Sequence, residues 1–133
     1  MACYMNNPTY LRILLQRRIA KRIAIRTLCR SLPPDLFMAD LDTSSDAVLI
    51  DLRTRAEIEA DGMIEGARHI DFLQDDFEGA LEPLDKYATY FVYGQRDKRG
   101  RMACALMAQR GFFHTIFLEG GKTAWDAAFN DSP

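Results

Sequence analysis

The sequence lacks long hydrophobic runs, CxxC motifs and metal-ligand motifs. No apolar run approaches the roughly 18 residues that a membrane-spanning helix needs, and basic residues from Arg12 to Arg22 interrupt any signal-peptide core. The three cysteines, Cys3, Cys29 and Cys104, form no CxxC pair, and their odd number argues against the disulfide framework of a secreted protein. We therefore expect a reducing, cytoplasmic location, no membrane span, no metal and no cofactor.

Acidic residues are absent from the first 34 positions, which carry seven Lys and Arg side chains, whereas the rest of the chain carries ten basic and nineteen acidic residues. The 133 residues suit one domain, and a hydrophobic content of 48% is enough for a single core. Helix-favouring residues predict a basic helical arm over residues 1–21, followed by a folded domain over residues 22–133. We expect the arm to dock on the acidic remainder of its own domain or to form a solvated helix face. We expect no nucleic acid, because the arm lacks the interleaved aromatics of nucleic-acid-binding segments.

Strand and helix patterns alternate along the folded domain. Branched residues at alternate positions favour an edge strand over 22–29, and apolar runs bounded by turns predict buried strands at 47–52 and 89–93. Further strands are predicted at 67–70 and 115–118, and helices at 35–41, 54–60, 71–81, 100–109 and 123–129. Thr54 and Glu57 form a capping box at the start of the second of these helices. This order predicts a single-domain α/β fold with a central, mostly parallel sheet and helices on both faces.

Four segments carry a family resemblance: the apolar-D-x-R strand at 48–53, the GMIEGA loop at 62–67, the strand at 90–93 and the closing LEGG-x-x-x-W at 118–125. In this order they resemble the rhodanese-like domain, a small α/β sulfurtransferase module whose relatives include the cell-cycle dual-specificity phosphatases. Met63 and Glu65 replace the histidine and proline that the family usually has in its GHIPGA loop. The resemblance implies a rhodanese-like fold for residues 22–133, with Asp51 and Arg53 supporting the active loop.

The active loop departs from the family pattern at its first residue. Active members read roughly C-R-x-G-x-R-S, with backbone amides that point at a sulfur-bound or anionic group. The same length is kept here from Gly94 to Arg99, but Gln95 replaces the first arginine and Asp97 the glycine. Sulfur transfer requires a thiolate, which Gly94 cannot supply, so we expect no catalytic residue here. The predicted anion-binding loop consists of Gly94, Gln95, Arg96, Asp97, Lys98 and Arg99, just before a helix N-terminus.

These observations predict a regulatory or binding module without sulfurtransferase activity, which holds a small anion or an acidic protein segment. The first alternative is an active sulfurtransferase or related thiol enzyme that uses Cys29, Cys104 or a cysteine of a partner chain, although both cysteines are expected to be packing residues. The second alternative is an interaction protein that oligomerises through the basic arm, residues 1–21. His69 and His114 have no metal-ligand companion, and we expect each to be bonded to a nearby carbonyl.

Overall fold

The computed structural model describes residues 28–130, so the predicted arm over residues 1–21 and most of the predicted strand 22–29 lie outside the described residues. The elements are β1 (Cys29–Leu32), α4 (Pro34–Thr43), β2 (Ala47–Asp51), α5 (Arg55–Asp61), β3 (Arg68–His69), α6 (Phe77–Leu81), β4 (Thr89–Tyr93), α7 (Asp97–Gln109), β5 (His114–Leu118), α8 (Gly121–Trp125) and a π-helical segment, η1 (Asp126–Asn130). Among these elements there is no helix with the length and apolar character to cross a membrane.

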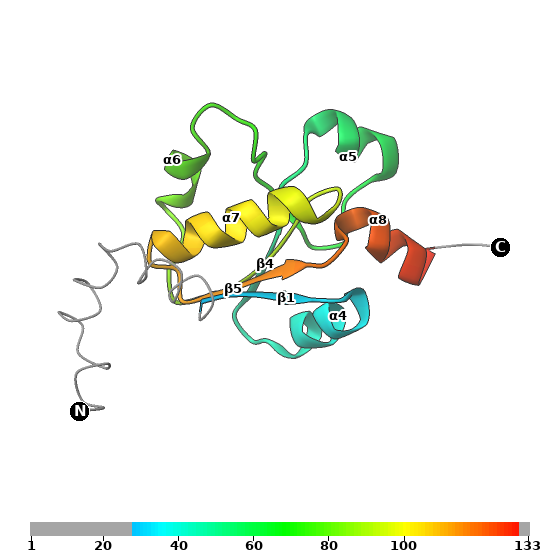
Figure 1. The fold of residues 1–133 in the computed structure, drawn as a ribbon, viewed down its shortest axis with the longest axis horizontal. Coiled ribbons are helices and arrows are strands. Elements are labelled where there is room, and N and C mark those ends of the chain that lie inside the picture. Colours follow the sequence, from blue (N-terminus) through cyan, green and yellow to red (C-terminus); the bar gives the residue numbers. More distant parts are fainter. Residues whose placement is uncertain (1–27, 131–133) are drawn as a thin grey trace.

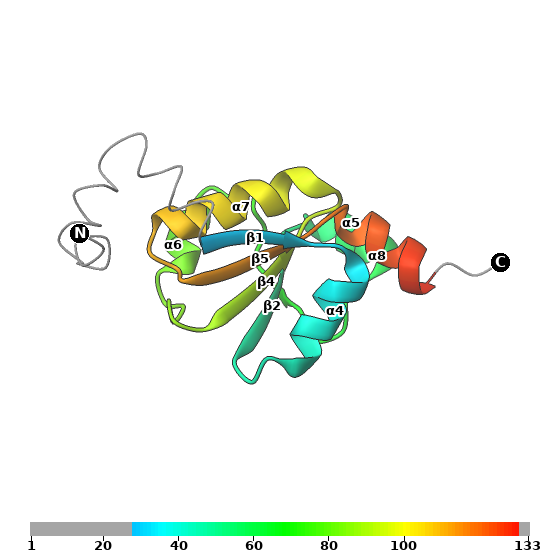
Figure 2. The same ribbon diagram turned by 60° about the horizontal axis from the view of Figure 1, so that its bottom comes forward.

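The strands form one parallel sheet in the order β1-β5-β4-β2-β3. Helices α6 and α7 cover one face of this sheet and α4 covers the other (Figures 1 and 2). The predicted single-domain α/β fold is therefore confirmed. Since all strands run in the same direction, the segments that follow β2, β4 and β5 meet at the carboxyl edge of the sheet, where ligands bind in proteins of this class.

The central strand β4 supplies core residues to both faces of the sheet, because successive side chains of a strand point in opposite directions. Tyr90 and Val92 pack in the cluster beneath α6 and α7, and all their neighbours in that cluster are buried or half-buried. Phe91 and Tyr93 pack on the other face with α4 and α8, where the rings of Phe37 and Phe91 lie edge to face at 5.3 Å. The apolar run at 89–93 thus becomes a strand buried from both sides.

Several predicted boundaries need correction, above all the helix expected over residues 71–81. Only Phe77–Leu81 is helical. Asp71 accepts a hydrogen bond from the Leu73 amide at 2.8 Å, and Asp76 accepts one from the Gly79 amide at 3.0 Å as the N-cap of α6. Such aspartate side chains satisfy backbone amides outside a helix, and therefore delay its start.

Three other boundaries differ from the prediction. Helix α7 begins at Asp97, three residues earlier than expected, so that an acidic side chain occupies its first turn, where the helix dipole favours it. Helix α8 begins at Gly121 and passes into the π-helical segment at Asp126, whereas one helix over 123–129 was expected. The first described strand begins at Cys29, where the predicted strand was expected to end.

Cys29 of β1 and Cys104 of α7 form a disulfide, with their Cα atoms 5.5 Å apart. The sequence predicted both as packing residues, and Cys104 is indeed fully buried. Their pairing was missed because 75 positions separate them in the sequence. Only the topology shows that α7 crosses β1 and β5 at the level of both cysteines.

Candidate functional site

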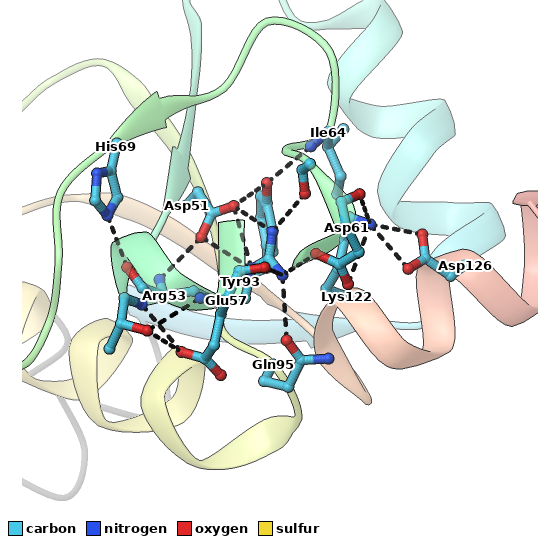
Figure 3. Close-up of polar contacts among 12 residues, drawn as sticks. Asp51, Arg53, Glu57, Asp61, Ile64, His69, Tyr93, Gln95, Lys122 and Asp126 are labelled. Atoms are coloured by element: carbon cyan, nitrogen blue, oxygen red, sulfur yellow. Dashed lines mark hydrogen bonds and ion pairs between the residues drawn. The ribbon is translucent and has the colours of Figure 1, made fainter. Parts of the chain in front are cut away.

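A buried aspartate and a buried arginine form the base of the site at the end of β2. Asp51 and Arg53 are both 0% exposed. The Asp51 carboxylate accepts hydrogen bonds from the Arg53 amide at 2.9 Å and from the Arg53 guanidinium at 3.0 Å. It also accepts a bond of 2.6 Å from the Tyr93 hydroxyl, which comes from the neighbouring strand β4 (Figure 3). Burial and the bond to Asp51 raise the pKa of Tyr93, so this hydroxyl stays protonated and donates.

The Arg53 guanidinium connects three segments of the site. It donates to Asp61 at the end of α5 at 2.7 Å, to the Gly62 carbonyl at 2.6 Å and to the Gln95 side chain at 3.2 Å (Figure 3). Burial alone would lower the pKa of Arg53, but its hydrogen bonds and the charges of Asp51 and Asp61 outweigh burial and raise it. Arg53 is therefore a fixed cation whose bonds to Asp61 and Gln95 join the end of α5 to the loop after β4.

The loop after β4 turns its carbonyl groups toward α8. The Gly94 carbonyl accepts a hydrogen bond from the Lys122 amide at 2.9 Å, and the Gln95 carbonyl accepts one from the Thr123 amide at 3.1 Å. In a trans peptide the C=O and N–H groups point in opposite directions, so the amides of Gln95 and Arg96 face away from α8. Within residues 28–130, no hydrogen bond is recorded from the amides of residues 95–99. Amides without a partner inside the helix are usual in the first turn of a helix and give its N-terminus a partial positive charge.

Two glycines after β5 allow this close approach of α8 to the loop. Gly121 has a φ of +61°, and a Cβ atom on it would lie 2.5 Å from the Gly94 carbonyl oxygen and 2.6 Å from that of Arg96. Gly120 also adopts a left-handed backbone, and its amide donates a 2.6 Å hydrogen bond to Asp97. Asp97 therefore fastens the first turn of α7 to the turn that begins α8.

Gly94 itself has no such backbone requirement, because its φ is not positive. A Cβ atom on Gly94 would lie 3.1 Å from Arg99 Cβ and 3.5 Å from both the Arg96 carbonyl oxygen and the Gly100 amide nitrogen. A side chain at this position would thus point into the loop, toward the first turn of α7. Gly94 therefore leaves the centre of the loop without a side chain, although the backbone conformation at this position does not require a glycine.

The cations around the loop are unequally neutralised. Arg99 makes two short bonds to the Glu57 carboxylate, of 2.6 and 2.7 Å. Its hydrogen bond is the main reason that the pKa of Glu57 falls to about 2, against the opposing effect of burial, and Thr54 contributes further bonds. Arg96 and Lys98 are exposed, and within the described part of the chain neither has an ion pair. Among the loop residues predicted from the sequence, Arg96 and Lys98 therefore carry positive charge that is exposed, whereas the charge of Arg99 is paired with Glu57.

Neither described cysteine lies at the loop. Cys104 is seven residues beyond Asp97 on α7, which corresponds to about 10 Å along the helix, and it is fully buried. Cys29 pairs in register with Thr115 near the amino end of β5, on the opposite edge of the sheet from the loop. As long as the two sulfurs are bonded to each other, neither can act as a nucleophile.

Three members of the network were not predicted: Tyr93, Asp61 and Lys122. Lys122 is almost fully buried, and its ammonium group lies 2.8 Å from both carboxylate oxygens of Asp126 and 3.5 Å from the Asp61 carbonyl (Figure 3). The only sequence signal for this pair was the spacing of four residues between Lys122 and Asp126, and the predicted helix over 123–129 began one residue after Lys122. His69 lies with Nε2 2.7 Å from the Arg53 carbonyl oxygen, as a histidine bonded to a nearby carbonyl.

Comparison with known proteins places this geometry in one family. The family model described as "Rhodanese-like domain" matches residues 34–128. A protein of Allochromatium vinosum named "Sulfurtransferase" is 33% identical over 85 residues, which cover 64% of this chain and 77% of the relative.

Solved structures agree with this match. The crystal structure of a rhodanese-like domain protein from Staphylococcus aureus superposes with a TM-score of 0.62 at 25% identity, over 72% of this chain and 90% of that chain. The Alr3790 protein from Anabaena sp. superposes with a TM-score of 0.64 at 27% identity, over 74% of this chain and 78% of that chain.

Proposed function

The chain belongs to the rhodanese-like domain family, and from this premise we propose that it is a member without sulfurtransferase activity that binds a small anion or an acidic protein segment. The observation that carries the proposal is Gly94, whose missing side chain would point into the anion-binding loop. Persulfide formation needs a thiolate at that point, and a glycine has no group that could replace it. The name of the Allochromatium vinosum relative indicates the chemistry from which this chain departs.

The cysteines support the same proposal. The alternative of an active thiol enzyme requires Cys29 or Cys104 to reach the loop, but both lie in the disulfide between β1 and α7. A cysteine of a partner chain remains an alternative that only an assay can test. Oligomerisation through residues 1–21 also stays a prediction, since that segment lies outside the described residues.

The anion would be held by amides and two exposed cations. The amides of Gln95 and Arg96 face away from α8, and Arg96 and Lys98 add positive charge beside them. Arg99 would contribute less than Arg96 and Lys98, because Glu57 already neutralises it. A ligand of this kind is a tetrahedral anion, or a carboxylate of an acidic segment, and we expect the encounter in the cytoplasm.

The enzyme question is tested by a sulfurtransferase assay with thiosulfate and cyanide on the full chain. We expect no thiocyanate above the rate without protein. Turnover by the wild-type chain would overturn the proposal, and loss of that turnover in Cys104→Ser or Cys29→Ser would identify the thiol responsible.

Anion binding is tested by titrating inorganic sulfate while recording amide NMR shifts. We expect the amides of residues 95–99 to shift together and Lys98→Gln to weaken binding by about fivefold, as the loss of about 1 kcal/mol of Coulomb attraction predicts. The matched control is Lys86→Gln, since Lys86 is also an exposed lysine and lies before the amino end of β4, at the opposite end of this strand from the loop. Shifts spread evenly over the domain, or equal effects of both substitutions, would contradict a site at the loop.

A further inference from the structure

The disulfide between Cys29 and Cys104 joins the edge strand β1 to α7, the longest helix within residues 28–130. Strand β1 has only four residues, and its one strand neighbour is β5. Helix α7 packs across β1, β5 and β4 on one face of the sheet (Figure 1). The Cα separation of 5.5 Å falls within the usual range of about 4.4 to 6.8 Å for a disulfide. The bond therefore gives β1 a covalent attachment beside its ladder with β5.

From this arrangement we propose that Cys29 and Cys104 are a reversible redox pair whose oxidation fastens β1 to α7. This inference is independent of the proposed anion site, which lies at the carboxyl end of β4, whereas Cys29 lies at the amino end of β1. In a reducing compartment a structural disulfide is rare, and those that form are usually transient and redox-sensing. The bond that the topology permits would then form on oxidation and open again on reduction.

The two cysteine residues differ in their exposure to solvent. Cys104 is fully buried, whereas Cys29 is half-buried at the edge of the sheet. In thiol–disulfide exchange a thiolate attacks one sulfur of the disulfide, and the sulfur that is more accessible to this thiolate is attacked first. An external thiol therefore attacks Cys29, and Cys104 is the leaving thiolate, which remains inside the domain and takes up a proton.

The oxidant is a low-molecular-weight disulfide of the glutathione class. The Cys29 thiolate attacks one sulfur of this disulfide and releases one small thiol, so that Cys29 carries a mixed disulfide. The Cys104 thiolate then attacks Cys29, releases the second small thiol and closes the protein bond. Two cysteine thiols are oxidised and one small disulfide is reduced to two thiols, so that atoms and electrons balance.

The first experiment follows the thiols of the full-length Cys3→Ser chain, which keeps the pair intact and removes the remaining cysteine. The folded protein is equilibrated in buffers of defined ratios of reduced to oxidised glutathione, and free thiols are then alkylated in denaturant and counted by mass spectrometry. We expect Cys29 and Cys104 to lose alkylation together in a single transition. Two alkylated cysteines at every ratio, or glutathione retained on Cys29 in place of the closed bond, would overturn the proposal.

The second experiment measures what the bond does to the fold. We expect reduction to lower the Tm of the Cys3→Ser chain by about 8 °C or more, as loss of a disulfide that closes a long loop predicts. The same reduction should leave the Tm of the Cys3→Ser/Cys29→Ser chain unchanged. Equal Tm values for the oxidised and reduced Cys3→Ser chain would contradict a stabilising bond, and this comparison needs no substitution in the pair.

Discussion

Replacing Gly94 by cysteine should give this loop the reactivity of a sulfurtransferase. The new Cβ atom would lie 3.1 Å from Arg99 Cβ and at ordinary contact distance from the remaining neighbours, so that one side chain must move by a few tenths of an ångström. Slight overpacking costs about 1 kcal/mol, and removing a glycine of ordinary φ from the unfolded chain returns about 0.4 to 1 kcal/mol. We therefore expect the stability of Gly94→Cys to stay within about 1 kcal/mol of the wild type.

The loop should also activate the new thiol. A free cysteine has a pKa of about 8.5, and a helix N-terminus with unpaired amides lowers it to about 7 or below. At pH 7.4 the thiolate fraction would rise from about 7% to about 70%. The thiolate would attack the outer sulfur of thiosulfate and release sulfite, and the resulting persulfide would pass its sulfur to cyanide.

Three measurements on Gly94→Cys test this reasoning: the pH dependence of alkylation by iodoacetamide, the mass of one added sulfur after thiosulfate, and thiocyanate formation. Gly94→Ser is the control, because it fills the same space without a thiol. The reasoning would be refuted by a folded Gly94→Cys protein whose new thiol keeps a pKa of about 8.5 and gains no sulfur from thiosulfate. In that case the loop would not be preformed for binding an anion.

Three further predictions concern how the loop is held. Arg53→Met should lower the free energy of unfolding by about 3 to 5 kcal/mol in chemical denaturation, because it leaves the buried carboxylate of Asp51 without its cation. The control Arg55→Met, at an exposed position, should change this free energy by less than about 0.5 kcal/mol. Equal effects of the two substitutions would contradict the buried network. Gly121→Ala should lower the free energy of unfolding by about 3 kcal/mol or more, because the new Cβ atom would collide with the carbonyl groups of the loop. The control Gly66→Ala also has a positive φ but has open space around the Cβ position, and it should lower this free energy by about 1 kcal/mol. The pKa of Glu57 is lowered to about 2, so the ionised carboxylate should stabilise the fold by about 1 to 3 kcal/mol above about pH 4.5, and this contribution should fade as the pH falls toward about 2. The measurement is the free energy of unfolding of wild type and Glu57→Gln across this pH range. A difference between the two proteins that does not change with pH would contradict the prediction.

Local patterns in the sequence predicted the parts of the fold whose energetics are local. The strand at 89–93 was predicted at its observed bounds, because an apolar run between turns can only be buried in an α/β sheet. The capping box of Thr54 and Glu57 forms as predicted, since it depends only on residues three positions apart. The prediction of a helix over 71–81 was wrong because Asp71 and Asp76 favour helix starts and turns equally, and the pattern does not tell which amides they bind.

The site depended on contacts that no local pattern contains. Arg53 was expected to support the loop, but its bonds to Asp61 and Gln95 join residues that only the crossover connections bring together. The partner of Arg99 was missed for a related reason: Glu57 is explained by its capping role, and nothing in the sequence shows that the same carboxylate also faces α7. A residue with a sufficient local role can therefore conceal a second, tertiary one.

The distribution of charge decides which ligands the proposed anion site would attract. Arg53 and Lys122 are buried, and their charges are neutralised by carboxylate partners, so they add little to the attraction of an incoming anion. Arg99 is available only if a ligand displaces Glu57, which at a pKa of about 2 stays ionised at every physiological pH. Attraction thus rests on exposed Arg96 and Lys98, whose fields are screened over about 8 Å at physiological salt. Binding should therefore weaken as salt is added, while the backbone amides continue to set the orientation of the bound anion.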